Sequence, residues 1–180
     1  MLLLVAGHET TVNLIGNGLL ALLRAPAQLE LLRRSPERIP AAVDELLRFD
    51  GPVQLSQRVA VRDIELLGRR VRGGDEIMLE LGAANRDATV FADPHQLDVS
   101  RDARAHVAFG GGIHHCLGAA LARLEGQVAL SALLARTESL ELAGLPTRRP
   151  TFTLRGLETL PVALVPRAPS AARRQTSVGR

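Results

Sequence analysis

The pattern of apolar residues changes at Gly51-Pro52, and this change limits the chain to a fold that combines helices with small sheets. Before this point the spacing of apolar residues predicts helices over 2–23, 26–34 and 41–49. After it, short alternating segments predict strands at 55–61, 64–67 and 76–81. The sequence therefore predicts a mainly α protein with small β-sheets, an α+β fold.

The second half of the chain repeats this mixture. Residues 83–87 predict a single helical turn, 91–105 a long polar loop, and 117–136 a strong helix rich in alanine and leucine. Strand segments follow within 139–165, and residues 160–165 are the clearest of them. We expect one folded unit over residues 1–166 and a disordered, arginine-rich tail over 167–180.

Composition excludes several classes of protein. The chain has 180 residues, 46% of them hydrophobic, which is enough for a packed core, and its single cysteine rules out an internal disulfide. The 22 basic side chains are all arginine and are scattered, and the aromatic side chains are four Phe without Tyr or Trp, which argues against nucleic-acid binding.

Neither a signal peptide nor a membrane span is predicted. The opening apolar run at residues 2–5 is too short for a signal peptide, and residues 10–23 are interrupted by Asn and Gly. We expect a cytoplasmic protein without membrane contact. The first helix starts without a capping residue, which indicates a chain that begins inside a larger fold.

Residues 109–118 combine a glycine-rich turn with the lone Cys116 at the expected start of a long helix. Glycines let the backbone approach a flat ligand, and a helix N-terminus lowers the pKa of a thiol. A single thiolate suits a metal that already has four ligands in a plane, as in haem, whereas structural zinc needs more protein ligands. A buried structural cysteine and a nucleophile assisted by His115 are the alternatives.

The same segment resembles the cysteine-ligand signature of the cytochrome P450 family, Phe-Gly-x-Gly-x-His-x-Cys-x-Gly. Its fixed positions are Phe109, Gly110, Gly112, His114, Cys116 and Gly118. The resemblance implies that these residues bind haem b (iron protoporphyrin IX) and that Cys116 is the axial ligand of the iron. It also implies that Phe109 packs beside the thiolate and that His114 donates to a haem propionate.

Residues 6–11 (Ala-Gly-His-Glu-Thr-Thr) resemble the oxygen-activation motif of that family. Gly7 leaves room for a diatomic ligand, and Thr10 with Glu9 forms an alcohol and acid pair that can pass protons toward the O2 site. The alternative is a helical threonine bonded back to a carbonyl. Arg58 resembles the arginine that pairs with a haem propionate, and the alternative is a surface arginine on a sheet.

Glu45 and Arg48 match the Glu-x-x-Arg motif of the family, whose spacing places both side chains on one helix face. An exposed pair of this kind contributes only about 0.2–0.5 kcal/mol, so a buried pair needs a further partner. The family supplies a third arginine from a Pro-x-Arg-Phe segment. Here Gln96 stands in its place, and we expect it to hydrogen-bond to Glu45.

The resemblance also implies the positions of substrate and redox partner. Two turns are expected to face the substrate, and their residues are Val53, Gln54, Leu55, Ser56, Gly156 and Leu157. Arg101, Arg104 and Arg123 flank the cysteine segment and are expected to form a basic face for an acidic electron carrier, unless they are ordinary solvated arginines.

Two functions follow from these observations. The first is a haem-thiolate monooxygenase that inserts one atom of O2 into a small organic substrate. Its electrons come from NAD(P)H through a ferredoxin and ferredoxin reductase or a flavoprotein. The second is a non-catalytic haem-binding remnant, because the resemblance corresponds to the C-terminal part of the cytochrome P450 fold, with the N-terminal half absent.

Overall fold

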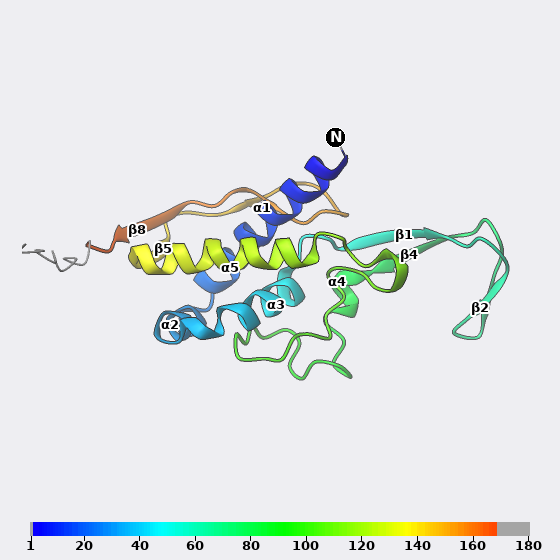
Figure 1. The fold of residues 1–180 in the computed structure, drawn as a ribbon, viewed down its shortest axis with the longest axis horizontal. Helices are drawn as coiled ribbons and strands as arrows, with labels where there is room; N and C mark the ends of the chain where they lie inside the picture. The colour runs from blue at the N-terminus through cyan, green and yellow to red at the C-terminus, as the bar shows by residue number, and fades with distance from the viewer. Residues whose placement is uncertain (1, 169–180) are drawn as a thin grey trace, which may run out of the picture.

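The computed structural model describes residues 2–168, which form five α-helices and four two-stranded sheets (Figure 1). The helices are α1 (Leu2–Leu23), α2 (Pro26–Arg34), α3 (Ile39–Asp50), α4 (Leu81–Ala84) and α5 (Ala119–Arg136). The strands are β1 (Leu55–Val59), β2 (Ile64–Leu66), β3 (Arg69–Val71), β4 (Glu76–Glu80), β5 (Thr137–Leu142), β6 (Thr147–Arg148), β7 (Leu157–Thr159) and β8 (Val162–Pro166). The predicted combination of helices with small sheets is confirmed.

The core lies where α1, α3 and α5 pack against one another. Two glycines allow the close approach of these helices. A Cβ at Gly18 of α1 would lie 3.0 Å from Leu46 of α3, and a Cβ at Gly126 of α5 would lie 3.3 Å from Val43. Larger side chains at these positions would force the helices apart, because protein cores have few voids.

The strands form two groups around this core, β1 to β4 and β5 to β8. Strands β1 and β4 pair antiparallel, with Leu55 opposite Glu80, and they lead to the β2–β3 hairpin, so this part projects as an arm (Figure 1). Strands β5 and β7 contact α1. Leu67 and Gly68 both have positive φ angles and form the tight turn between β2 and β3.

A buried polar cluster ties the β6–β7 segment to α1 and α3. Asp50, at the end of α3, accepts a hydrogen bond from Arg148 at 2.8 Å and another from Arg155. Asn17 of α1 is completely buried and donates to the carbonyl oxygens of Asp50 and Arg155 at 3.2 and 2.9 Å. Because each buried polar group has a partner here, the segment is held in one orientation.

Gly156 lies so close to α1 that a side chain there would have to displace the side chain of Asn13. A Cβ at this position would lie 2.2 Å from Oδ1 of the buried Asn13. We expect Gly156→Ala to lower the free energy of unfolding by about 1–3 kcal/mol, measured by denaturant titration. In the control Gly144→Ala the new Cβ meets Pro161 at an ordinary 3.5 Å. Equal stability of the two variants would contradict the prediction.

Several predicted boundaries are corrected by the structure. The long helix begins at Ala119, with Gly118 as its N-cap, and not at residue 117. The helical turn predicted over 83–87 lies at 81–84, directly after β4. Strand β3 was not predicted, and it forms because the Leu67-Gly68 turn folds residues 69–71 back onto β2. Of the tail predicted over 167–180, residues 169–180 lie outside the described residues.

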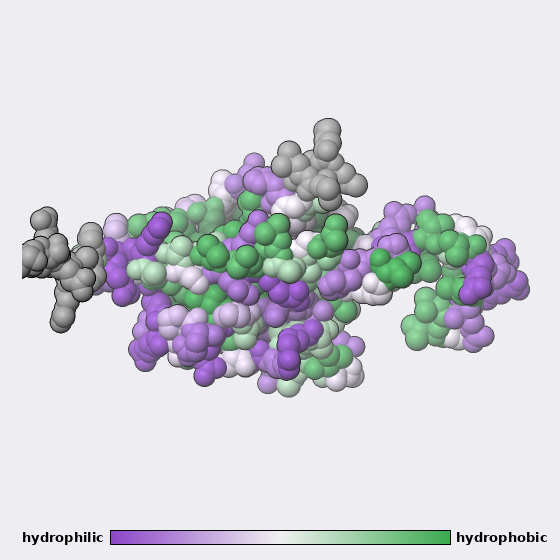
Figure 2. Space-filling view, in the orientation of Figure 1, coloured by the Kyte–Doolittle hydropathy of each residue, from purple (hydrophilic) through white to green (hydrophobic). Residues whose placement is uncertain are grey.

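Apolar side chains reach the surface over α5 (Figure 2). Leu121, Leu124 and Val128 of this helix are each more than half exposed, at 58%, 55% and 59%. Leu117, just before the helix, is 93% exposed. Within residues 2–168, no helix has both the length and the apolar character needed to cross a bilayer.

Candidate functional site

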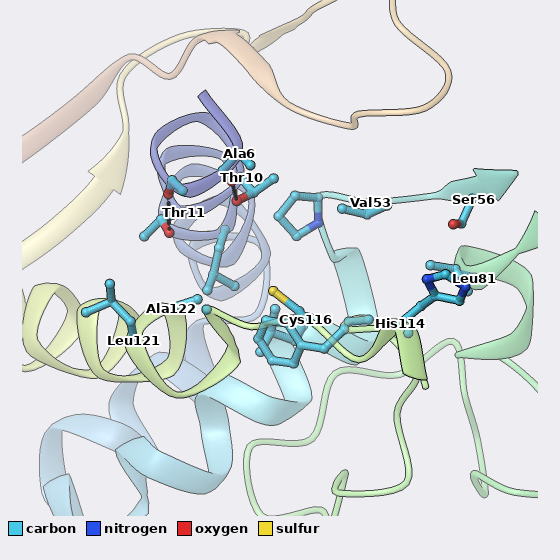
Figure 3. Close-up of a pocket in the computed structure, with 18 of the residues that line it drawn as sticks. Ala6, Thr10, Thr11, Val53, Ser56, Leu81, His114, Cys116, Leu121 and Ala122 are labelled. Atoms are coloured by element: carbon cyan, nitrogen blue, oxygen red, sulfur yellow. Dashed lines mark hydrogen bonds between the residues drawn. The ribbon is translucent and has the colours of Figure 1, made fainter. Parts of the chain in front are cut away.

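A cavity of about 300 Å³ lies between α1, the segment that leads into β1, and the loop before α5 (Figure 3). Its walls are mostly apolar. Figure 3 shows Thr10 and Thr11 of α1 at one side, Ser56 and His114 at another, and the sulfur of Cys116 pointing into the space between them. Cavities of this size and lining are typical of small-molecule and cofactor sites.

The backbone of the cysteine loop explains the direction of the sulfur. Gly110 and Gly112 have φ angles of 68° and 59°, a conformation that residues with a side chain rarely adopt. The turn that they make brings the N–H of Cys116 to the carbonyl oxygen of Phe109, at 2.9 Å. Cys116 is exposed on the cavity side. The loop thus presents a thiol at the open face of the cavity.

The thiol lies before α5, as the sequence predicted, but two residues further from its start than expected. Helix α5 begins three residues later, at Ala119. The N–H of Ala119 donates to the carbonyl oxygen of Cys116 at 3.2 Å. The first helical amide is therefore bonded to the backbone of Cys116.

On α1, the residues that resemble the oxygen-activation motif face two different surfaces. Gly7 and Thr10 line the cavity, together with Thr11. Glu9 instead accepts a hydrogen bond from Arg149 at 2.7 Å, and both side chains are partly exposed. The hydroxyl group of Thr10 donates to the carbonyl oxygen of Ala6 at 2.7 Å. This back-bonded arrangement is the alternative that the sequence left open for Thr10.

Two polar side chains of the predicted cofactor site also line the cavity, Arg58 and His114. Arg58 is half-buried and donates to the hydroxyl oxygen of Ser56 and to the carbonyl oxygen of Gln57, both at 2.7 Å. Phe109, Gly110 and Gly118 complete the predicted residues in the wall, whereas Gly112 shapes the loop without reaching the cavity.

The Glu45–Arg48 pair is fully buried. Both side chains have no exposed surface, and the Arg48 guanidinium binds both carboxylate oxygens of Glu45, at 2.6 and 2.8 Å. Its remaining N–H groups donate to the carbonyl oxygens of Asn85, Pro94 and Gln96. Every donor of this guanidinium therefore has a partner, and the pair holds the loop after α4 against α3.

The third member of this network is Arg101, which corrects the expectation for Gln96. Arg101 donates to Glu45 at 3.3 Å, and Gln96 contributes its carbonyl oxygen to Arg48. Sequence reasoning missed Arg101 because the family motif places the arginine five residues earlier. The sequence did offer a signal for this role, because Arg101 lies in the same loop as Gln96.

The proposed basic face is also corrected. Arg101 is only 13% exposed and is engaged with Glu45. Arg123 is paired with Asp44, at 2.7 Å. Arg104 is 82% exposed and is paired with Asp102. The three arginines therefore do not offer three free charges to an acidic carrier.

Of the two turns expected to face the substrate, only part lies at this cavity. Val53 and Ser56 line it. Gln54 and Leu55 face a separate hollow beside Phe152. Gly156 and Leu157 pack on α1. The wall also contains residues that no sequence pattern indicated, among them Leu81, Ala108, Leu121 and Ala122. Leu121 and Ala122 lie in the first turn of α5, three and four residues after the last glycine of the cysteine signature, so their position was the available signal.

Comparison with known proteins adds an independent line of evidence. A family model described as cytochrome P450 matches residues 37–155. The putative cytochrome P450 140 of Mycobacterium tuberculosis is 52% identical over 166 residues, which are 92% of this chain and 38% of that protein. The biotin biosynthesis cytochrome P450 of Bacillus subtilis is 50% identical over 163 residues, 90% of this chain and 41% of that protein.

Solved structures agree with these matches. The crystal structure of P450BioI, in complex with an acyl carrier protein ligated to hexadec-9Z-enoic acid, superposes with a TM-score of 0.88. It is 49% identical to this chain, and the match covers 91% of this chain and 43% of that one. The chain thus spans about 40% of the length of the relatives that it matches.

Proposed function

Because this chain belongs to the cytochrome P450 family, we propose that it carries the haem-binding part of a haem-thiolate monooxygenase, in which the thiolate of Cys116 would bind the iron. The observation that supports this proposal best is the thiol of Cys116, which points into a mostly apolar cavity opposite α1 (Figure 3). Only the thiolate form of a cysteine acts as a metal ligand.

The residues of the cavity fit a haem. The macrocycle is flat and apolar, and the walls are mostly apolar. Gly7 lines the cavity, and a Cβ atom added there would meet nothing within 4 Å, so α1 leaves open space at this wall. Arg58 and His114 provide N–H groups in the wall, which suit the two carboxylates of a haem. We propose that these two residues hold the propionates.

The chemistry that a bound haem supplies is the activation of O2 and the transfer of one oxygen atom to an organic substrate. Within this chain, Cys116 would donate electron density to the iron, and the loop turn at Gly110 would keep the sulfur directed at it. Phe109 lines the same cavity as Cys116 and adds an apolar ring to its wall. An apolar shell around a metal site limits the access of water and tunes the metal.

We propose that Thr10 is the residue of α1 that handles protons in the cavity. Its hydroxyl proton is directed to the carbonyl oxygen of Ala6, so its oxygen can accept a hydrogen bond from a donor in the cavity. Rotation of the hydroxyl would let it donate instead. Glu9 can join this relay only after it releases Arg149, because the two side chains are now paired at 2.7 Å.

We further propose a small organic substrate and electrons from NAD(P)H through a ferredoxin with its reductase or through a flavoprotein. These parts of the proposal rest on family membership. The walls supplied by this chain that the substrate would meet are Val53 and Thr10, since both line the cavity.

The test is a reduced carbon monoxide spectrum. The 180-residue chain is combined with haem, reduced, and exposed to carbon monoxide. We expect the strongly red-shifted Soret band of a thiolate-ligated iron. A band at the ordinary position of imidazole-ligated or free haem would contradict the proposal. Stoichiometric binding is checked by haem titration in the same samples.

A further inference from the structure

Three polar side chains outside the cavity gather around Phe109, the residue that begins the cysteine loop. They come from separate parts of the chain: Asp44 from α3, His106 from the long loop, and Arg123 from α5. None of the three lines the cavity. Their contacts with one another and with Phe109 give them a position between the helical core and the thiol.

Asp44 joins the other two. Its Oδ1 accepts hydrogen bonds from Nε of Arg123 at 2.7 Å and from Nε2 of His106 at 3.2 Å. The side chains of Asp44 and Arg123 are 16% and 30% exposed. Burial alone would raise the pKa of Asp44, but the hydrogen bonds from His106 and Arg123 outweigh it and lower the pKa. Asp44 therefore stays charged at neutral pH and holds Arg123 in place.

Arg123 in turn lies against Phe109. The centre of its guanidinium is 4.6 Å from the centroid of the Phe109 ring, within the range of a cation–π interaction. Asp44 binds Nε of the same guanidinium, and this hydrogen bond restricts the rotation of the guanidinium relative to the Phe109 ring. The ring of Phe109 is thus held by α5 and, through Asp44, by α3.

His106, three residues before Phe109 in the chain, also packs against the Phe109 ring. Its ring centroid lies 5.7 Å from that of Phe109. Its Nδ1 accepts a hydrogen bond from the N–H of Ala108 at 3.1 Å, which places the ring proton on Nε2, toward Asp44. The His106 side chain is 1% exposed. The His106 ring therefore connects the backbone that leads into the cysteine loop to the carboxylate of Asp44.

Phe109 transmits this arrangement to the thiol. Its carbonyl oxygen accepts the N–H of Cys116 at 2.9 Å, so one residue carries both the stacked ring and the backbone bond of the cysteine. We infer that Asp44 and Arg123 are positioning residues: they clamp the Phe109 ring and thereby fix the Cys116–Phe109 hydrogen bond that aims the sulfur into the cavity. That this direction of the Cys116 sulfur serves haem ligation rests on the proposed function.

The clamp is tested in the haem-free chain by amide hydrogen exchange followed by NMR. In Arg123→Gln and in Asp44→Ala, we expect the Cys116 amide to exchange about tenfold faster, because each change removes one link of the clamp. In the double variant we expect about the same rate as in either single variant, since the two residues act as one unit. Core amides such as that of Leu32 are followed in parallel.

The matched control is Arg104→Gln. Arg104 forms a hydrogen-bonded pair with Asp102 at 2.6 Å, but both side chains are mostly exposed, and Arg104 lies near the cysteine loop in sequence. We expect no change at the Cys116 amide. An unchanged Cys116 amide in Arg123→Gln would overturn the inference, and so would equal acceleration of the Leu32 amide, which indicates general destabilisation.

A second measurement separates this inference from the proposed function. After addition of haem, the reduction potential of the iron is compared between the wild-type chain and Arg123→Gln, and we expect a shift that Arg104→Gln does not produce. If the Cys116 amide responds as expected but the wild-type chain gives no red-shifted carbon monoxide band, the proposed function fails and the clamp is supported. If the band forms and the amide does not respond, the clamp fails alone.

Discussion

Replacement of Cys116 by serine removes the red-shifted Soret band of the haem-loaded, reduced, carbon monoxide-treated chain completely. The expected loss is total because the band requires a sulfur anion on the iron, and a serine hydroxyl remains protonated at neutral pH. The chain contains a single cysteine, so no other thiol can take its place. The measurement is the carbon monoxide difference spectrum at equal haem content.

A matched control comes from the same loop. Ile113 is 98% exposed and does not line the cavity, so Ile113→Ala changes the loop without changing the site. This variant should keep the red-shifted band at full amplitude. If the band persists in Cys116→Ser, the iron has a different ligand. If it disappears in both variants, the loop responds to any change, and the spectrum carries no information about the sulfur.

Replacement of Arg48 by methionine lowers the free energy of unfolding by about 3–5 kcal/mol, since it leaves the buried Glu45 carboxylate without its main partner. The cost is large because both side chains are fully buried and the guanidinium also binds backbone oxygens of the loop after α4. For a chain of this size the melting temperature should fall by about 10 °C. Thermal unfolding followed by circular dichroism measures this change.

Two comparisons identify the buried charge as the cause. In the double variant Glu45→Leu/Arg48→Met the loss should be clearly smaller than in Arg48→Met, because the fully buried carboxylate is removed together with its main partner, and Arg101 keeps its hydrogen bonds to the carbonyl oxygens of Ala92 and Gln96. Arg34→Met breaks the exposed pair of Arg34 with Glu30 and should cost less than about 0.5 kcal/mol. A loss in the double variant as large as in Arg48→Met would show that packing, and not charge, determines the stability here.

Local patterns predicted most of the secondary structure. Helix α2 starts at Pro26 as predicted, and α3 ends at Asp50, directly before the predicted stop at Gly51-Pro52. These ends were predictable because proline and glycine restrict or release the backbone at their own positions. The start of α5 was misplaced by two residues. The glycine turn before it extends to Gly118, and the alanine and leucine content of 117–136 carries no information about where that turn ends.

Pairings between distant residues were decided by the tertiary structure. Glu9 is bound by Arg149, 140 residues later in the chain, and Glu45 by Arg101 where the motif suggested Gln96. No local rule selects one arginine among 22 for a given carboxylate. The choice depends on which loops the packed helices bring within hydrogen-bond distance.

By itself the sequence determined the helical and β regions and the glycine turn with its single cysteine, because these depend on the backbone preferences of neighbouring residues. The tertiary structure alone decided that Thr10 and Cys116 face one cavity while Glu9 does not, and that Asp44, His106 and Arg123 meet at Phe109. These arrangements depend on the packing of α1, α3 and α5, and side chains far apart in the chain become neighbours only when that packing is complete.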